Sequence, residues 1–137
     1  MLKKLVITAL LLTHASLVCA ANYIDPDELK LMIQQKKEVV IVDIQPAGEF
    51  ERHYLNGAIE TNAFPAKSPD EKQRLDKTLP VIKASTAPVV IICPRGGSGA
   101  KNSYEYLQSR GIPEERLLIL KGGIAGWPHL ELLQHDR

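Results

Sequence analysis

The chain has 137 residues, of which 24% are charged and 45% apolar, the usual balance for a single globular domain. Its 17 basic and 16 acidic residues give a net charge of +1 and form no basic cluster, so a nucleic-acid-binding surface is not expected. The sequence contains no internal repeat and no low-complexity tract.

Residues 1–20 have the composition of a targeting segment. Lys3 and Lys4 precede an apolar run, and Val18-Cys19-Ala20 places small residues at the spacing of a cleavage site. This pattern predicts a secretory signal peptide over residues 1–20 and a mature domain over residues 21–137, either periplasmic or secreted. After cleavage, no stable contact with a membrane is expected.

Two alternatives to cleavage are open. The apolar run could stay as a membrane anchor, although its length of about 26 Å as a helix is short for a hydrocarbon core of roughly 30 Å and His14 interrupts it. Cys19 could be acylated as in a lipoprotein, although Val18 is larger than the residue that such signals have before the cysteine. We favour cleavage, which leaves Cys93 as the only cysteine of the mature chain and excludes an internal disulfide.

Helical and strand patterns alternate along the mature chain. Asp25 is the expected N-cap of a first helix, with Pro26 at the first helical position and Glu28 reaching back to the cap. Further helices are predicted over residues 47–53, 68–79, 100–110 and 124–134, and strands over Val39–Ile44, a short segment after a bend at 55–59, Val89–Ile92 and Leu117–Leu120. The apolar strands favour an α/β fold with a mainly parallel central sheet and helices on both faces.

Two polar residues of the first half are candidates for a site. Asp43 lies near the carboxyl end of its predicted strand, where it is either a site residue or a hydrogen-bond anchor for a neighbouring loop, and we favour the anchor. His53 has no second histidine or acid at the spacing of a metal site, so we interpret it as a partly exposed side chain rather than a ligand or general base.

The segment from Val89 to Gly99 carries the strongest signal for chemistry. Cys93 stands where a buried strand ends and a glycine-rich loop leads into a helix, which is where open α/β sheets bind ligands. A free thiol with a pKa near ~8.5 is only about 3% ionised at neutral pH, and a helix dipole of roughly 0.3–1 kcal/mol moves that pKa by less than one unit. Converging backbone N–H groups are therefore needed to hold a sulfur anion.

The loop has the residues for such a cradle. Gly96, Gly97 and Gly99 tolerate the backbone angles of an anion nest, Arg95 adds a positive charge, and Ser98 adds a hydroxyl donor. We interpret the loop as a cradle for a thiolate or persulfide. The alternative is that a lone cysteine after an apolar strand is only a small buried hydrophobic residue.

Three motifs together resemble the rhodanese-like sulfurtransferases. The first is VVIVDIQPAGEFERHYLNGAI at 39–59, through Asp43, the pair Glu49-Phe50 and Gly57-Ala58. The second is the cysteine loop at 93–99, and the third is LLILKGGIAGW at 117–127, through its two glycines and its tryptophan. The three motifs in this order span nearly the whole mature chain.

The chain also departs from the family pattern. Gln45 stands where the family usually has an arginine after the aspartate, and Tyr54 replaces a common histidine. In the loop, Ser98 and Gly99 stand where many single-domain members have Arg and Ser, which leaves Arg95 as the sole loop cation. A preference for thiosulfate is therefore not implied.

The resemblance implies sulfur transfer through a persulfide on Cys93, without a metal or an organic cofactor. It implies that the donor is bound by the loop residues Pro94, Arg95, Gly96, Gly97, Ser98 and Gly99. The expected partners are a small anionic sulfur donor and a thiophilic acceptor, with a protein thiol as a further acceptor. Two other functions are alternatives: a non-catalytic rhodanese-like module that binds a partner or senses redox state through Cys93, and a phosphatase or arsenate reductase, whose loops have an arginine at the position of Gly99.

Overall fold

The computed structural model describes residues 21–135, so the expected signal peptide at 1–20 and Cys19 lie outside the described residues. The strands are β1 (Tyr23–Ile24), β2 (Val40–Asp43), β3 (Tyr54–Leu55), β4 (Ile59–Glu60), β5 (Val89–Ile92), β6 (Leu117–Leu120) and β7 (Leu133–Gln134). The α-helices are α1 (Pro26–Gln34), α2 (Ala47–Arg52), α3 (Pro69–Gln73), α4 (Leu79–Lys83) and α5 (Ser98–Ser109). The 3₁₀ turns are η1 (Arg74–Thr78), η2 (Glu114–Arg116), η3 (Ile124–Gly126) and η4 (Leu130–Leu132).

Five parallel strands form the central sheet in the order β1-β6-β5-β2-β4, and β3 pairs with β7 in a separate antiparallel ribbon. Strand β5 is central, and its last residue, Ile92, pairs with Asp43 of β2. The predicted α/β fold with a mainly parallel sheet is confirmed. Among residues 21–135, no helix combines the length and the apolar character that crossing a membrane requires.

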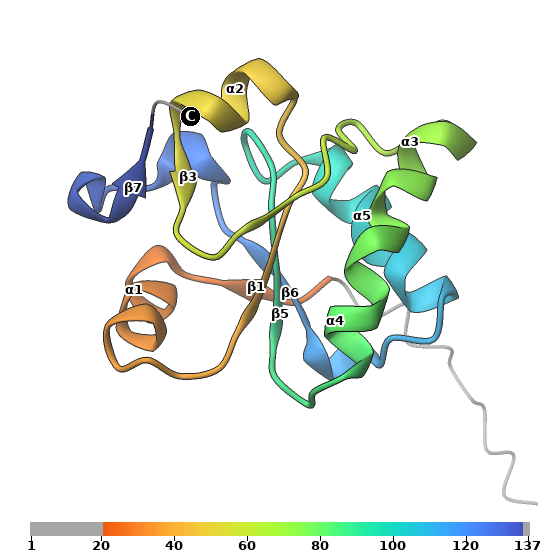
Figure 1. The fold of residues 1–137 in the computed structure, drawn as a ribbon, viewed down its shortest axis with the longest axis horizontal. Coiled ribbons are helices and arrows are strands. Elements are labelled where there is room, and N and C mark those ends of the chain that lie inside the picture. The colour runs from red at the N-terminus through yellow and green to blue at the C-terminus, as the bar shows by residue number, and fades with distance from the viewer. Residues whose placement is uncertain (1–20, 136–137) are drawn as a thin grey trace, which may run out of the picture.

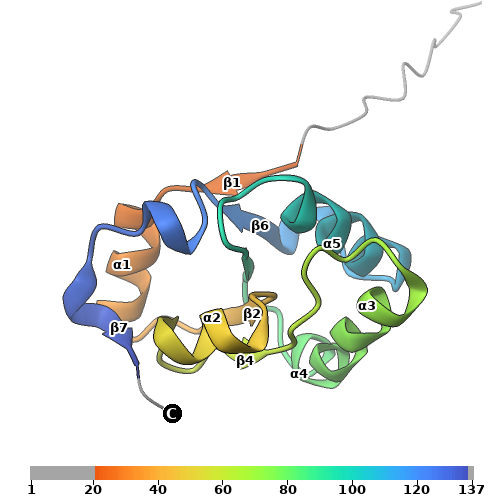
Figure 2. The ribbon, with the colours of Figure 1, turned by 90° about the horizontal axis from the view of Figure 1, so that it is seen from above.

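Both faces of the sheet are covered, as Figures 1 and 2 show: α1 and the β3–β7 ribbon lie on one side, and α3, α4 and α5 lie on the other. The side chains of β5 alternate between two cores accordingly. Val89 and Ile91 belong to the core under α5, whereas Val90 and Ile92 belong to the core under α1. This burial on both sides explains why the strand is apolar without interruption.

The N-terminal elements differ from the sequence prediction in detail. The sequence pattern predicts no strand before Asp25, but Tyr23–Ile24 form the edge strand β1 beside β6. Pro26 is the first residue of α1, as predicted, but the Asp25 side chain makes no capping hydrogen bond and lies 3.9 Å from the Lys121 ammonium. A full cap is present instead on the helix predicted from residue 68, where Ser68 and Glu71 form a complete capping box at the start of α3.

The helix predicted over residues 124–134 is wrong. The segment contains two short 3₁₀ turns, η3 and η4, and ends as β7. Trp127 is buried and its indole N–H donates to the carbonyl of His129 at 2.8 Å, while Leu133 pairs with Leu55 of β3. Pairing with β3 and burial of the tryptophan therefore override the local helical pattern.

Candidate active site around Cys93

Cys93 follows β5 directly and lies at the carboxyl end of the sheet, where the loop of residues 94–97 leads into α5 (Figure 1). Its side chain is 2% exposed and packs with the core under α5. Helix α5 begins at Ser98, two residues earlier than predicted, so that Ser98 and Gly99 belong to its first turn. The thiol is thus placed beside a helix N-terminus by the strand that precedes it and the helix that follows.

The Cys93 sulfur accepts a hydrogen bond from the backbone N–H of Gly96 at 2.7 Å. Gly96 adopts a φ of +75°, which turns this N–H back toward the sulfur and which favours glycine. Within residues 21–135 this is the one hydrogen bond to the sulfur. The predicted convergence of several amides on the thiol is therefore not observed, and Gly96 alone supplies an N–H. The first N–H groups of α5 have no acceptor within the helix and can bind outer atoms of a ligand.

The cysteine loop packs closely against the segment that follows β6. The N–H of Ile124 donates to the carbonyl of Cys93 at 2.9 Å, and the N–H of Ala125 donates to that of Pro94 at 3.0 Å. A Cβ atom on Gly123 would lie 2.4 Å from the Cys93 carbonyl oxygen and 2.6 Å from the Gly96 nitrogen. A side chain cannot fit there, which gives a physical reason for the second glycine of the Gly-Gly pair in the third motif.

A cavity of about 350 Å³ opens above the sulfur. Its lining residues, which define the Cys93 cavity, are Glu49, Phe64, Cys93, Pro94, Arg95, Gly97 and Ser98. Five of the seven predicted site residues therefore line one cavity, and Gly96 contributes its N–H to the sulfur. The Arg95 side chain is exposed and makes no ion pair with the described part of the chain.

Gly99 is the predicted site residue that does not line the cavity. It is buried, and a Cβ atom there would lie 2.7 Å from Cδ2 of the Phe64 ring. Phe64 thus occupies the space that a side chain at position 99 would need, and it forms part of the cavity wall. Sequence reasoning missed Phe64, since nothing in its own segment indicates that it contacts the start of α5.

Asp43 is fully buried at the end of β2 and is held by Gln45. The backbone N–H and the side-chain Nε2 of Gln45 each donate to the Asp43 carboxylate at 2.9 Å, and Nε2 also donates to the carbonyl of His53 at 2.9 Å. Burial, with a smaller contribution from the nearby Glu60, raises the pKa of Asp43 to about 7 despite these two hydrogen bonds. The geometry agrees with the anchor interpretation, because the pair ties the end of β2 to the end of α2.

His53 is exposed and lies outside the Cys93 cavity, in agreement with its interpretation from the sequence. Residues 21–135 contain no group of three or more His, Cys, Asp or Glu side chains that could hold a metal ion.

The model of the rhodanese-like domain family matches residues 25–129. A rhodanese-like domain protein from Staphylococcus aureus is similar in structure at a TM-score of 0.58 and 25% identity, over 85% of this chain and 99% of that one. A yeast protein tyrosine phosphatase of the rhodanese family superposes with a TM-score of 0.64 at 16% identity, over 85% of this chain and 93% of its own.

An As-Sb reductase from Leishmania major has a TM-score of 0.64 and 16% identity, over 85% of this chain and 80% of its own. At 16% identity, the likeness to the phosphatase and the reductase shows the fold alone. A comparison with curated protein sequences found no significant match. The family match covers more than half of the chain and agrees with the three motifs and the parallel sheet, and the chain therefore belongs to the rhodanese-like domain family.

Proposed function

We propose that this protein is a sulfurtransferase that moves sulfane sulfur from a small anionic donor, such as thiosulfate or a persulfide, to a thiophilic acceptor through a persulfide on Cys93. The observation that carries the proposal is the position of the Cys93 sulfur, which accepts the Gly96 N–H at 2.7 Å and lines an open cavity at the start of α5. Membership of the rhodanese-like family supports the same chemistry. A protein thiol is a further acceptor that this chemistry admits.

Transfer proceeds in two steps. The Cys93 thiolate attacks the outer sulfur of thiosulfate, a new S–S bond forms at Cys93, and sulfite leaves with the electron pair of the broken S–S bond. A nucleophile such as cyanide or a thiolate then takes the outer sulfur, and Cys93 leaves as the thiolate. In both steps negative charge lies near the Gly96 N–H and the N-terminus of α5, where hydrogen-bond donors stabilise it.

Intact mass spectrometry of the purified protein tests the proposal. After thiosulfate, we expect Cys93 to gain the mass of one sulfur atom, and cyanide should remove it; Cys93→Ser is the control that should gain nothing. If neither thiosulfate nor an organic persulfide adds sulfur, a binding or redox-sensing module that uses Cys93 becomes the better proposal. Hydrolysis of an aryl phosphate that Cys93→Ser abolishes would indicate a phosphatase instead, although Gly99 stands where the phosphatase loops have an arginine.

Arg95 is proposed to attract the anionic donor. Because its guanidinium has no ion pair within the described residues and lines the Cys93 cavity, Arg95→Ala should raise the KM for thiosulfate about tenfold, the loss expected for one charge-assisted contact. The KM for a neutral donor, the persulfide of 2-mercaptoethanol, should change much less. An equal loss for both donors in steady-state kinetics would refute this role.

We also propose that the protein is exported to the periplasm or secreted, on the basis of the sequence pattern of residues 1–20. N-terminal sequencing of the protein isolated from the producing cell should give Ala21 as the first residue. An intact Met1 would contradict cleavage, and a lipid on Cys19 would support the lipoprotein alternative.

A further inference from the structure

A second cavity of about 280 Å³ lies beside the Cys93 cavity, and its volume is close to the lower end of typical small-molecule sites, about 300 Å³. We call it the side cavity, and its polar lining consists of Gln45, Glu49, Arg52, His53 and Arg95. Glu49, Pro94 and Arg95 line both cavities. A molecule whose sulfur is at Cys93 can therefore reach the side cavity by passing over Pro94 and Arg95.

The charges of the side cavity suit a small zwitterion. Arg52 and Arg95 contribute two guanidinium groups, and Glu49 contributes a carboxylate. The Nε of Arg52 donates to the carbonyl of Gly48 at 3.0 Å, but its terminal nitrogens bond to no other described residue. The two guanidinium groups can thus bind a carboxylate and the Glu49 carboxylate can bind an ammonium group, as an α-amino acid requires.

A buried side chain, Gln45, positions one wall of the side cavity. Gln45 is 1% exposed, lines the cavity, and donates from Nε2 to the carbonyl of His53 at 2.9 Å. This bond fixes the end of α2, which carries both Arg52 and His53, relative to the end of β2. A buried polar side chain thus positions the corner that holds Arg52, as expected for a preformed site.

We infer that the side cavity binds the α-amino-carboxylate of a small thiol whose persulfide is the sulfur donor. The inference rests on the proposed function and names the donor class for it. The Cys93 thiolate attacks the outer sulfur of the persulfide, the S–S bond of the donor breaks, and the thiol part leaves as a thiolate with the electron pair. Sulfur is transferred without an added oxidant or reductant. Thiosulfate has no organic part and leaves the side cavity unused.

Four persulfides that share a two-carbon thiol unit and carry different charged groups on it test the inference: those of cysteine (carboxylate and ammonium), 3-mercaptopropionate (carboxylate), cysteamine (ammonium) and 2-mercaptoethanol (an uncharged hydroxyl). The rate of sulfur addition to Cys93, followed by intact mass, should be highest for cysteine persulfide, lower with the carboxylate alone, and lowest for the other two. Arg52→Gln should lower the ratio of kcat/KM for cysteine persulfide to that for 2-mercaptoethanol persulfide about tenfold.

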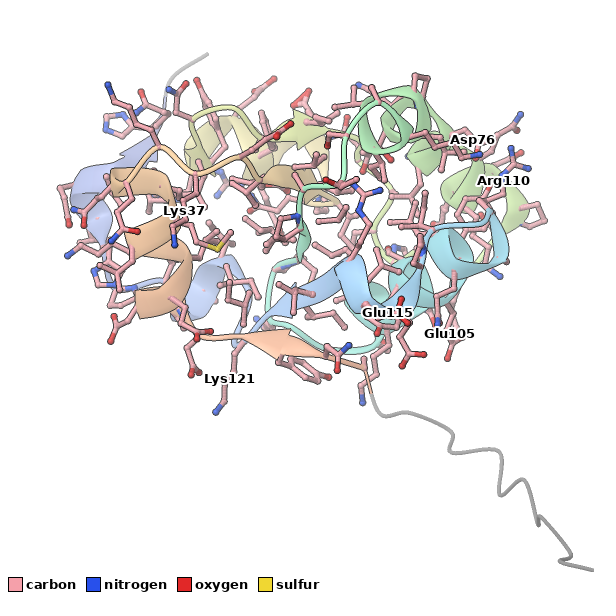
Figure 3. All side chains as sticks on the ribbon, turned by 90° about the horizontal axis from the view of Figure 1, so that it is seen from below. Lys37, Asp76, Glu105, Arg110, Glu115 and Lys121 are labelled. Atoms are coloured by element: carbon pink, nitrogen blue, oxygen red, sulfur yellow. The ribbon has the colours of Figure 1, made fainter. Side chains whose placement is uncertain are left out.

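Arg110→Gln is the matched control, because Arg110 is an exposed arginine at the far end of α5, 3.8 Å from Asp76 (Figure 3). It should leave the donor ratio unchanged. Glu49→Gln should lower the ratio of cysteine persulfide to 3-mercaptopropionate persulfide, since only cysteine has the ammonium group. Equal rates for all four persulfides would overturn the inference and leave the proposed function intact, whereas no sulfur on Cys93 from any donor, thiosulfate included, would remove both.

Discussion

Replacing Gly123 by alanine should abolish sulfur loading of Cys93 and lower the free energy of unfolding by about 3 kcal/mol or more. Gly123 has a φ of +60° and a ψ of −162°, a region of backbone space that only glycine occupies readily and that costs other residues about 1–3 kcal/mol. The added Cβ would also lie within 2.6 Å of the Arg95 and Gly96 nitrogens, so the cysteine loop itself must move. Moving Gly96 removes the N–H that binds the Cys93 sulfur.

Gly111→Ala is the matched control for this prediction. Gly111 has a φ of +92°, but a Cβ atom there meets nothing within 4 Å. Gly111→Ala should therefore lower the free energy of unfolding by only about 1 kcal/mol, the cost of a positive φ for alanine, and Cys93 should still load sulfur fully. Urea unfolding and intact mass after thiosulfate measure the two effects. If Gly123→Ala loads sulfur as the wild type does, the close packing of the two loops is not what shapes the site.

The sequence was sufficient for those parts of the fold that depend on local pattern. The strands predicted over Val89–Ile92 and Leu117–Leu120 have the same bounds in the structure. Both are unbroken apolar runs bounded by turns, and such runs mark the ends of a buried strand clearly. The start predicted for the third helix, at residue 68, also agrees with the structure, in which Ser68 is the N-cap of α3. The helix prediction for residues 124–134 was wrong because it used only the local pattern, whereas the end of this segment pairs with β3.

The site was only partly predictable, for a similar reason. The loop and its cysteine are contiguous, so their chemistry could be inferred from residue types alone. Phe64 reaches Gly99 from a distant segment, and Arg52 of α2 lines the same cavity as Arg95 of the cysteine loop. The departures at Gln45 and Gly99 are visible in the sequence, but their consequences required the structure. Asp43 is buried with no ion pair to any of residues 21–135, and the Phe64 ring fills the space beside Gly99.

The stability of the protein should fall by about 4 kcal/mol as the pH rises from 4 to 8, through Asp43 alone. Burial raises the pKa of Asp43 from 3.8 to about 7 in the folded protein, whereas the unfolded chain ionises near 3.8. Between these values the folded state holds a proton that the unfolded state has lost. Asp43 therefore stabilises the fold fully below about pH 4, and this contribution is lost as the pH rises through about 7. Urea unfolding across this range measures the slope.

Gln45→Arg isolates the contribution of Asp43 from that of other carboxylates. A guanidinium at position 45 would place a positive charge beside the Asp43 carboxylate, where Gln45 now donates two neutral hydrogen bonds. The pKa of Asp43 should then fall, and the loss of stability between pH 5 and 8 should shrink by up to about 2.5 kcal/mol relative to the wild type.

Gln45→Met supplies the control of similar length, because it removes the side-chain donor to Asp43 without adding charge. It should keep the pH slope or steepen it, since the carboxylate loses a hydrogen bond. Unfolding is the appropriate measurement rather than activity, because Gln45 also lines the side cavity. An identical slope for Gln45→Arg and the wild type would mean that Asp43 is ionised in the folded protein throughout this range. The two hydrogen bonds from Gln45 would then be enough to offset the cost of burying the charge.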